Sequence, residues 1–167
     1  MKMIRPNPIA FAVLMMALPA LAIGQDGGTA TTKLTAGPKD DQEKQKPGPV
    51  DQDAERSFKT TDSGLKYRIL RNSDKPKPKA EDSVKVHYKG WLDDKTIFDS
   101  SYRRGEKISF PLRRVIPGWT EGMQLIGEGG MIELEIPAKL VYGTRGVPGL
   151  IAPNSTLHFV VELFDIQ

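Results

Sequence analysis

The chain has 167 residues, of which 38% are hydrophobic and 27% are charged. This length accommodates one domain with a substantial apolar core and leaves little room for a second. The sequence contains no cysteine, which excludes disulfides, thiolate metal clusters and Cys/His nucleophilic catalysis. Stability must therefore come from packing, and any catalysis must use other groups.

Residues 1–22 have the pattern of a secretory signal peptide. Lys2 and Arg5 precede the apolar run IAFAVLMMALPALA, which ends in the small-x-small triplet ALA. Because a spanning helix needs about 20 apolar residues, we expect cleavage after Ala22 rather than an uncleaved membrane anchor. Cleavage would lower the formal net charge from +3 to +1, which gives no indication of nucleic-acid binding. The sequence thus predicts export to the periplasm or the extracellular space, without stable membrane insertion.

Residues 23–57 are predicted to be a disordered linker. From Gln25 to Ser57 the only aliphatic residues besides alanine are Leu34 and Val50, set among Gly, Pro, Lys, Asp and Gln. Such a segment buries too little apolar surface to offset the entropy lost on ordering. A charged docking tail is the alternative interpretation.

Residues 58–167 are predicted to form the folded domain. Apolar and polar residues alternate with the period of a β-strand in four segments: 65–69, 84–92, 132–136 and 157–163. Strands with one apolar and one solvated face indicate an antiparallel sheet that is covered on one side. A short helix from Pro117 to about Ile126 is the predicted cover, because Trp119, Met123 and Ile126 recur at helical spacing. The fold class is therefore α+β.

The polar residues of these strands do not assemble a known catalytic motif. His87 and His158, the only histidines, fall on outward strand positions, where we expect them to be solvated. The acids at 93–94 are expected in a turn, and Glu133 and Glu135 on the solvated face of a strand. No metal site and no cofactor are predicted.

Six short motifs along the domain carry a specific resemblance. They are VHYKG with Tyr88, FDSS with Phe98 and Asp99, VIPGW with Trp119, VYGTRG with Tyr142, PGLIAP with Leu150 and Ile151, and the last strand with Phe159. In this order and spacing, from about Thr61 to Gln167, they resemble the FKBP-type peptidyl-prolyl cis/trans isomerases, the tacrolimus-binding immunophilins. The resemblance implies a strongly bent antiparallel sheet wrapped around one short α-helix, with the substrate proline in a cleft between them.

The resemblance also implies a role for each matched residue. Trp119 would form the floor beneath the proline ring, and the walls would be Tyr88, Phe98, Val115, Ile116 and Phe159. Leu150 and Ile151 would line the rim. The Tyr142 hydroxyl would bond a substrate carbonyl, and the Asp99 carboxylate would face the twisting amide.

The residue patterns alone leave simpler roles open for several of these positions. Phe98, Val115 and Phe159 also fit plain core positions. Tyr142 fits a turn aromatic, and Asp99 fits a partner for turn N–H groups or for Arg104.

Two positions depart from the more familiar family pattern. Ile108 stands where many members have an aromatic residue, and Val147 stands where several have histidine. The segment FPLRRVIPGW is the compact form common in bacterial relatives. The resemblance therefore does not predict residue preference before proline or macrolide affinity.

The implied activity agrees with the lack of a nucleophile. Amide resonance sets the barrier to X-Pro rotation at roughly 18 to 20 kcal/mol, and no bond breaks on the way. The twisted amide is less polar than the planar one, so an apolar cleft favours it. The implied enzyme is a monomeric proline isomerase that acts on proline-containing polypeptides, accelerates folding of exported proteins and binds macrolides of the tacrolimus type. The alternatives are a proline-binding module or holdase chaperone with little turnover, and a structural domain tethered to the cell envelope.

Overall fold

A computed structural model describes residues 34–167. The predicted signal peptide and the first part of the predicted linker, residues 23–33, lie outside the described residues. Within residues 34–167, no helix has both the length and the hydropathy needed to cross a membrane.

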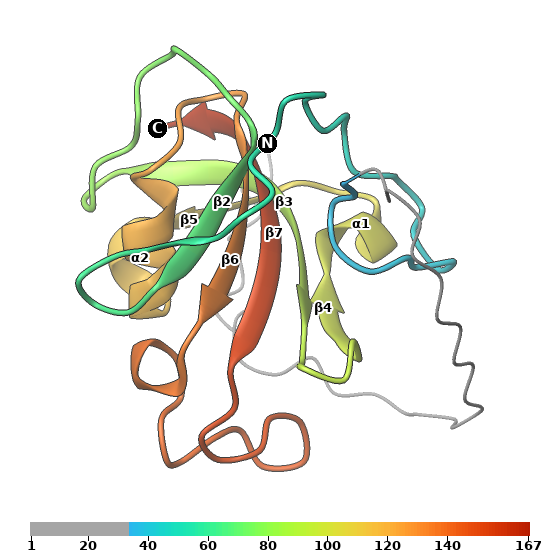
Figure 1. The fold of residues 1–167 in the computed structure, drawn as a ribbon, viewed down its shortest axis with the longest axis vertical. Helices are drawn as coiled ribbons and strands as arrows, with labels where there is room; N and C mark the ends of the chain where they lie inside the picture. The colour runs from blue at the N-terminus through green and yellow to red at the C-terminus, as the bar shows by residue number, and fades with distance from the viewer. Residues whose placement is uncertain (1–33) are drawn as a thin grey trace, which may run out of the picture. The chain divides into compact units, whose positions relative to one another are not determined.

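One antiparallel sheet organises the described part of the chain (Figure 1). Its strands are β1 Lys59–Thr60, β2 Lys66–Arg71, β3 Ser83–Trp91, β4 Ile97–Ser100, β5 Ile108–Pro111, β6 Met131–Ile136 and β7 Leu157–Ile166. Their order is β1-β2-β6-β7-β3-β4, and β5 pairs with β3 beside β4. The four predicted strands are confirmed as β2, β3, β6 and β7. The strands β1, β4 and β5 are too short to show a period in the sequence.

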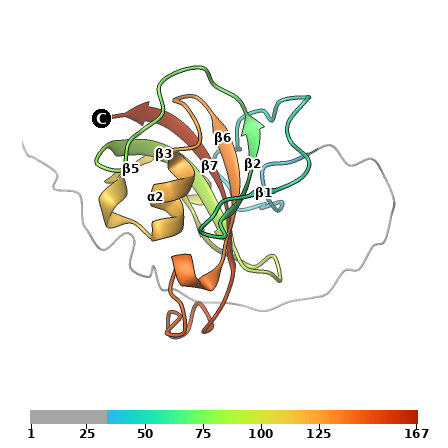
Figure 2. The ribbon, with the colours of Figure 1, turned by 60° about the vertical axis from the view of Figure 1, so that its left-hand side comes forward.

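The longer helix, α2 Pro117–Met123, lies within the curl of the sheet (Figure 2). Ile116 is its N-cap, and Pro117 occupies its first turn as predicted. Trp119, Met123 and Ile126 are all buried, which confirms the predicted apolar face. The helix ends at Met123, three residues before the expected end.

Two glycines let α2 lie close to β6. A Cβ at Gly122 would approach the Leu134 side chain to 2.8 Å, and one at Gly118 would collide with Ile136. Real Cβ atoms do not tolerate such approaches. The close contact places the first turn of α2, which carries Trp119, against the sheet.

A further short helix, α1 Ser101–Arg104, was not predicted from the sequence. The 3₁₀ turns η2 Leu112–Arg114 and η3 Ala138–Leu140 precede α2 and follow β6. Ser100 caps α1 by accepting a hydrogen bond from Arg103 N at 3.3 Å, and Gly105 ends it in the left-handed region at φ 80°. A serine N-cap and a glycine C′ residue are the usual ends of a helix.

Residues 34–57, here called the strap, lie on the sheet face opposite α2 (Figure 1). The strap amides of Asp51 and Glu55 donate to the Leu70 and Ile69 carbonyls at 2.9 and 3.2 Å. A small apolar cluster beneath the strap consists of Ala36, Leu70, Trp91, Tyr102, Met131 and Val160. The prediction of a disordered linker is therefore wrong for residues 34–57.

The polar strap has few apolar side chains, and buried ion pairs and hydrogen bonds hold it on the sheet instead. The Glu162 carboxylate accepts from Tyr102 at 2.6 Å, Arg71 at 2.8 Å and the Gly48 amide at 3.0 Å. Lys89 pairs with Glu43 at 2.7 Å and donates to a strap carbonyl at 2.8 Å. Buried ions are tolerated when each is paired and hydrogen-bonded.

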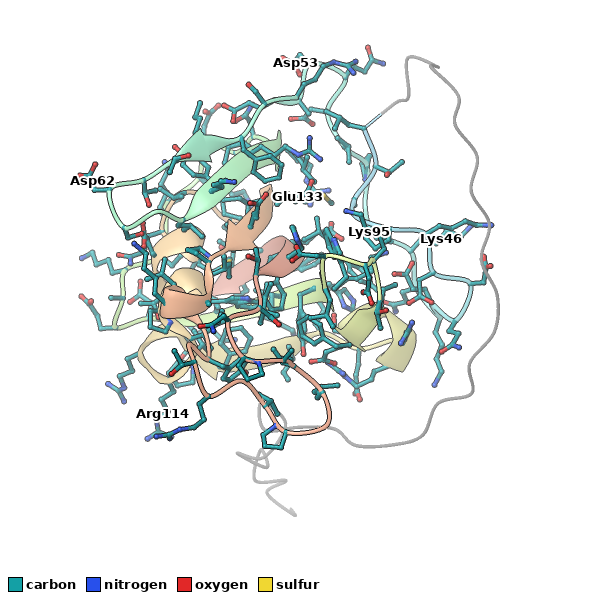
Figure 3. All side chains as sticks on the ribbon, turned by 60° about the horizontal axis from the view of Figure 1, so that its bottom comes forward. Lys46, Asp53, Asp62, Lys95, Arg114 and Glu133 are labelled. Atoms are coloured by element: carbon teal, nitrogen blue, oxygen red, sulfur yellow. The ribbon has the colours of Figure 1, made fainter. Side chains whose placement is uncertain are left out.

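This cover also corrects the prediction that the outward strand residues are solvated. His87 is only 3% exposed: Nε2 meets Gln45 of the strap, and Nδ1 meets Ser101, both at 2.8 Å. Burial lowers the pKa of His87. Glu133 is buried and pairs with Arg68 at 2.7 Å; Figure 3 shows it within the body of the fold, whereas Arg114 projects from the periphery.

His158 and the neighbouring acids are less enclosed. The His158 ring stacks on Trp91 with centroids 5.8 Å apart, and Nε2 meets Asp93 at 2.7 Å. Asp93 and Asp94 lie in the turn after β3, as expected, and Glu135 pairs with Lys66 at 2.6 Å.

Candidate functional site

An aromatic cluster surrounds the first turn of α2. The Trp119 ring contacts Tyr88 of β3 at 5.2 Å and Phe159 of β7 at 5.3 Å, both nearly perpendicular. Phe98 of β4 extends the cluster through Phe159 at 5.6 Å. Perpendicular aromatic pairs are a favoured geometry. The structure thus brings together four of the residues singled out in the sequence.

One member of this cluster was not predicted. Phe110 of β5 contacts Trp119 at 5.3 Å between ring centroids. The short alternation in ISF was its only indication in the sequence. The Trp119 indole is fully buried at 0% exposure, on the face of the helix that the sequence predicted to cover the sheet.

Gly90 makes room for the aromatic contact between β4 and β7. A Cβ at this position would lie 2.6 Å from the Phe159 ring and 2.7 Å from the Phe98 ring. Any larger residue would therefore push the two rings apart. The glycine of the VHYKG motif is explained by this approach.

Asp99 of β4 lies at the centre of a polar network beside the aromatic cluster. Its carboxylate accepts hydrogen bonds from the Tyr88 hydroxyl and from Arg104 Nη1, the latter at 2.5 Å. Arg104 Nη2 also donates to the Tyr88 hydroxyl at 2.9 Å. The pairing of Asp99 with Arg104, one of the alternatives considered from the sequence, is thus present. The hydrogen bond from Tyr88, which belongs to the aromatic cluster, places this carboxylate beside the cluster.

The electrostatics of the network keep the Tyr88 phenol protonated. Burial raises the pKa of Tyr88, and the negative charge of Asp99 raises it further. A neutral phenol can donate to the carboxylate. Asp99 therefore keeps two donors, one on β3 and one on α1.

Tyr142 follows η3 and is half-buried. Burial raises the pKa of its hydroxyl, and the negative charge of Asp99 contributes in the same direction. The Tyr142 hydroxyl thus stays protonated and can donate a hydrogen bond. The Tyr142 carbonyl accepts from the amides of Arg145 and Gly146, both at 3.2 Å, so Tyr142 also begins a turn.

The other predicted site residues lie on the segments before α2 and before β7. Val115 and Ile116 are half-buried, and the Ile116 carbonyl accepts from Trp119 N at 2.9 Å. Ile151 is buried and bridges Val147, whereas Leu150 between them is half-buried. Val115, Ile116 and Leu150 thus keep part of their surface accessible, whereas Ile151 is almost fully covered. Among residues 34–167, no three His, Asp or Glu side chains come together as a metal site would require.

The sequence also matches known proteins. Residues 74–164 match the sequence profile of the FKBP-type peptidyl-prolyl cis-trans isomerases. The chain is 52% identical over 113 residues to the FKBP-type isomerase FkpA of Escherichia coli K12, covering 68% of this chain and 42% of that protein. An FkpA from Aeromonas hydrophila is 51% identical over 109 residues, covering 65% of this chain and 40% of that protein.

Solved structures show the same fold. The crystal structure of Escherichia coli FkpA superposes with a TM-score of 0.65, covering 68% of this chain and 53% of that one. A peptidyl-prolyl cis-trans isomerase from Pseudomonas syringae, 34% identical, superposes with a TM-score of 0.63 and covers 68% and 83%. The chain spans about half the length of the curated relatives that it matches. The profile covers more than half of the chain, which therefore belongs to the FKBP-type peptidyl-prolyl cis-trans isomerase family.

Proposed function

We propose that this protein is a peptidyl-prolyl cis/trans isomerase that accelerates X-Pro bond rotation in exported polypeptides. The observation that carries the proposal is the Asp99 network, held by Tyr88 and Arg104 directly beside the buried aromatic cluster. Family membership supports it. An apolar binding protein needs the aromatic rings, but it has no need of a fixed carboxylate beside them.

The proposed mechanism uses desolvation and electrostatics. Half-buried side chains would take up the substrate proline over the Trp119 indole and remove water from the amide. These conditions favour the less polar, twisted amide over the planar one. Asp99 acts on the twisted carbonyl through its charge, and the Tyr142 hydroxyl donates to a substrate carbonyl. The binding surface in this proposal is formed by Tyr88, Phe98, Val115, Ile116, Trp119, Leu150, Ile151 and Phe159.

The partners and the location follow from the same proposal. The predicted signal peptide supports export to the periplasm or the extracellular space. Unfolded clients with X-Pro bonds are the substrates, and tacrolimus-type macrolides are candidate ligands of the same surface. We propose a monomer, with residues 1–22 removed and residues 34–167 as the folded unit.

The test is proline isomerisation of a short peptide by the full chain. Asp99→Ala should lower kcat/KM at least about tenfold, since a lost electrostatic contact at a reacting centre costs that much or more. Tyr142→Phe should lower it by about threefold to tenfold. Glu135→Gln, which removes an exposed ion pair, is the matched control and should leave the rate unchanged.

The outcomes separate the proposed functions. A wild-type rate equal to the uncatalysed background would contradict the enzyme. Suppressed aggregation of a client protein without such turnover would identify a holdase instead.

A further inference from the structure

An ion pair with a buried carboxylate joins the strap to the short helix α1. The Asp40 carboxylate, whose side chain is 3% exposed, accepts from Arg103 Nε at 2.6 Å. The Gln42 amide donates to the other Asp40 oxygen at 3.0 Å and orients the carboxylate. Such a buried carboxylate has a strong requirement for its partner.

Two further contacts join the strap to α1. The amides of Lys44 and Gln45 both donate to the Tyr102 carbonyl, at 3.1 and 3.3 Å. The Gln45 side chain reaches α1 indirectly through His87, whose Nδ1 meets the Ser101 hydroxyl at 2.8 Å. The strap therefore contacts α1 directly at its second and third residues and reaches the first through His87.

The last residue of α1 is the one that enters the candidate site. Arg104 donates to Asp99 at 2.5 Å and to the Tyr88 hydroxyl at 2.9 Å. Arg103, its neighbour, turns to the strap instead. A helix of four residues has little stability of its own, so external contacts decide where α1 lies and where it directs Arg104.

We propose that strap residues 40–45 are a positioning element of the candidate site, and that Asp40 is a positioning residue acting through Arg103 and α1 on Arg104. The catalytic consequence rests on the proposed function; the geometric consequence does not. Through α1 and Arg104, the polar strap thus helps to hold the Asp99 carboxylate beside the aromatic cluster.

The experiment uses the full chain with two readouts. The first is kcat and KM for isomerisation of a proline peptide. The second is the NMR signals of the Arg104 guanidinium, which report its pairing with Asp99 whether or not the protein turns over substrate. The variants are Asp40→Ala, Asp40→Glu, Arg103→Gln and Arg104→Met, with the double variant Asp40→Ala/Arg104→Met. Glu55→Gln is the control, because Glu55 bonds β2 rather than α1.

Asp40→Ala and Arg103→Gln should shift the Arg104 signals and lower kcat/KM about threefold to tenfold, mainly through kcat. Asp40→Glu should restore part of the rate, and Glu55→Gln should change neither readout. In the Arg104→Met background, Asp40→Ala should have no further effect on the rate, because the two residues act in series.

Three results would overturn the proposal: unchanged Arg104 signals in folded Asp40→Ala and Arg103→Gln, rate losses that add in the double variant, or lowered thermal stability with an unchanged kcat. If the wild-type chain shows no turnover, the proposed function fails, and the Arg104 signals alone decide whether the strap positions α1.

Discussion

The two faces of strand β3 differ in what covers them. On one face Tyr88 packs against Trp119 of α2, among aromatic and aliphatic side chains. On the other face His87 and Lys89 bond Gln45 and Glu43 of the strap. Both faces are buried, although the sequence alternates as if one were solvated. A polar strand position can therefore indicate a covering segment that supplies its partners.

The helix α2 and the strap also have different roles. The α2 face holds a carboxylate, Asp99, next to half-buried apolar side chains, which is the environment that a chemical role requires. On the strap face, Glu162 is buried and accepts three hydrogen bonds from other groups of the chain. We therefore assign the proposed catalytic contacts to the α2 face. The strap face stabilises the fold and, in our proposal, positions α1.

Deleting the strap should be the most destabilising change. A chain that begins at residue 58 uncovers Trp91, Leu70 and Val160, and it should lose at least about 3 kcal/mol of unfolding free energy. Urea unfolding of this chain and of one that begins at residue 34 measures the difference. Equal stability of the two chains would show that the strap does not stabilise the fold.

Filling the space at Gly90 tests the α2 face. Gly90→Ala forces apart the Phe98 and Phe159 rings and should destabilise the fold by up to about 3 kcal/mol. Because the rings belong to the proposed binding surface, KM for a proline peptide should rise as well. An unchanged KM, measured under conditions in which the variant is folded, would show that these rings do not contribute to peptide binding.

Two ion pairs between β2 and β6 differ in how deeply they are buried. Glu133→Gln breaks a pair with side chains 9% and 17% exposed and should cost about 2 kcal/mol. Glu135→Gln breaks a pair with side chains 27% and 49% exposed and should cost less than about 0.5 kcal/mol. Urea midpoints provide the measurement, and equal costs would contradict the burial assigned to Glu133.

A further expected effect concerns the pH dependence of stability. Burial lowers the pKa of His87 in the folded chain, against the negative charge of Glu162 and together with the positive charges of Lys107 and Arg104. Between the unfolded and the folded pKa the unfolded chain binds more protons. The contribution of His87 to stability is therefore fully present above about pH 6.5. Below that pH the free energy of unfolding falls, by at most about 1.4 kcal/mol per pH unit for one proton.

His87→Gln should remove this component. The measurement is the urea midpoint at pH 7.5 and pH 5.5 for the wild type and the variant. A drop of the same size in both chains would assign the pH dependence to other groups.

The α2 face could be predicted from the sequence much further than the strap face. Pro117, the spacing of Trp119 and Met123, and the six motifs indicated the helix, the sheet and most of the aromatic cluster. Phe110 was missed because its strand is too short to show a period. Arg104 was considered only as a partner for Asp99, because α1 has no apolar period of its own.

The strap could not be predicted from its composition, because the groups that bind it lie elsewhere in the chain. Its contacts are a buried Asp40, a pair between Glu43 and Lys89, and backbone hydrogen bonds, none of which leaves an apolar pattern. The large aromatics Trp91 and Tyr102 were the one available indication of a second apolar cluster. Neither had a role on the α2 face.

The α2 face carries the proposed catalytic contacts, whereas the strap face stabilises the fold and positions α1. Proline isomerisation and urea unfolding, measured side by side for Asp99→Ala and Glu133→Gln, test this division. Asp99→Ala should lose at least about tenfold in kcat/KM, and Glu133→Gln should keep its rate while losing stability. A wild-type rate no faster than the uncatalysed reaction, or an Asp99→Ala variant as fast as the wild type, would contradict the catalytic role of the α2 face.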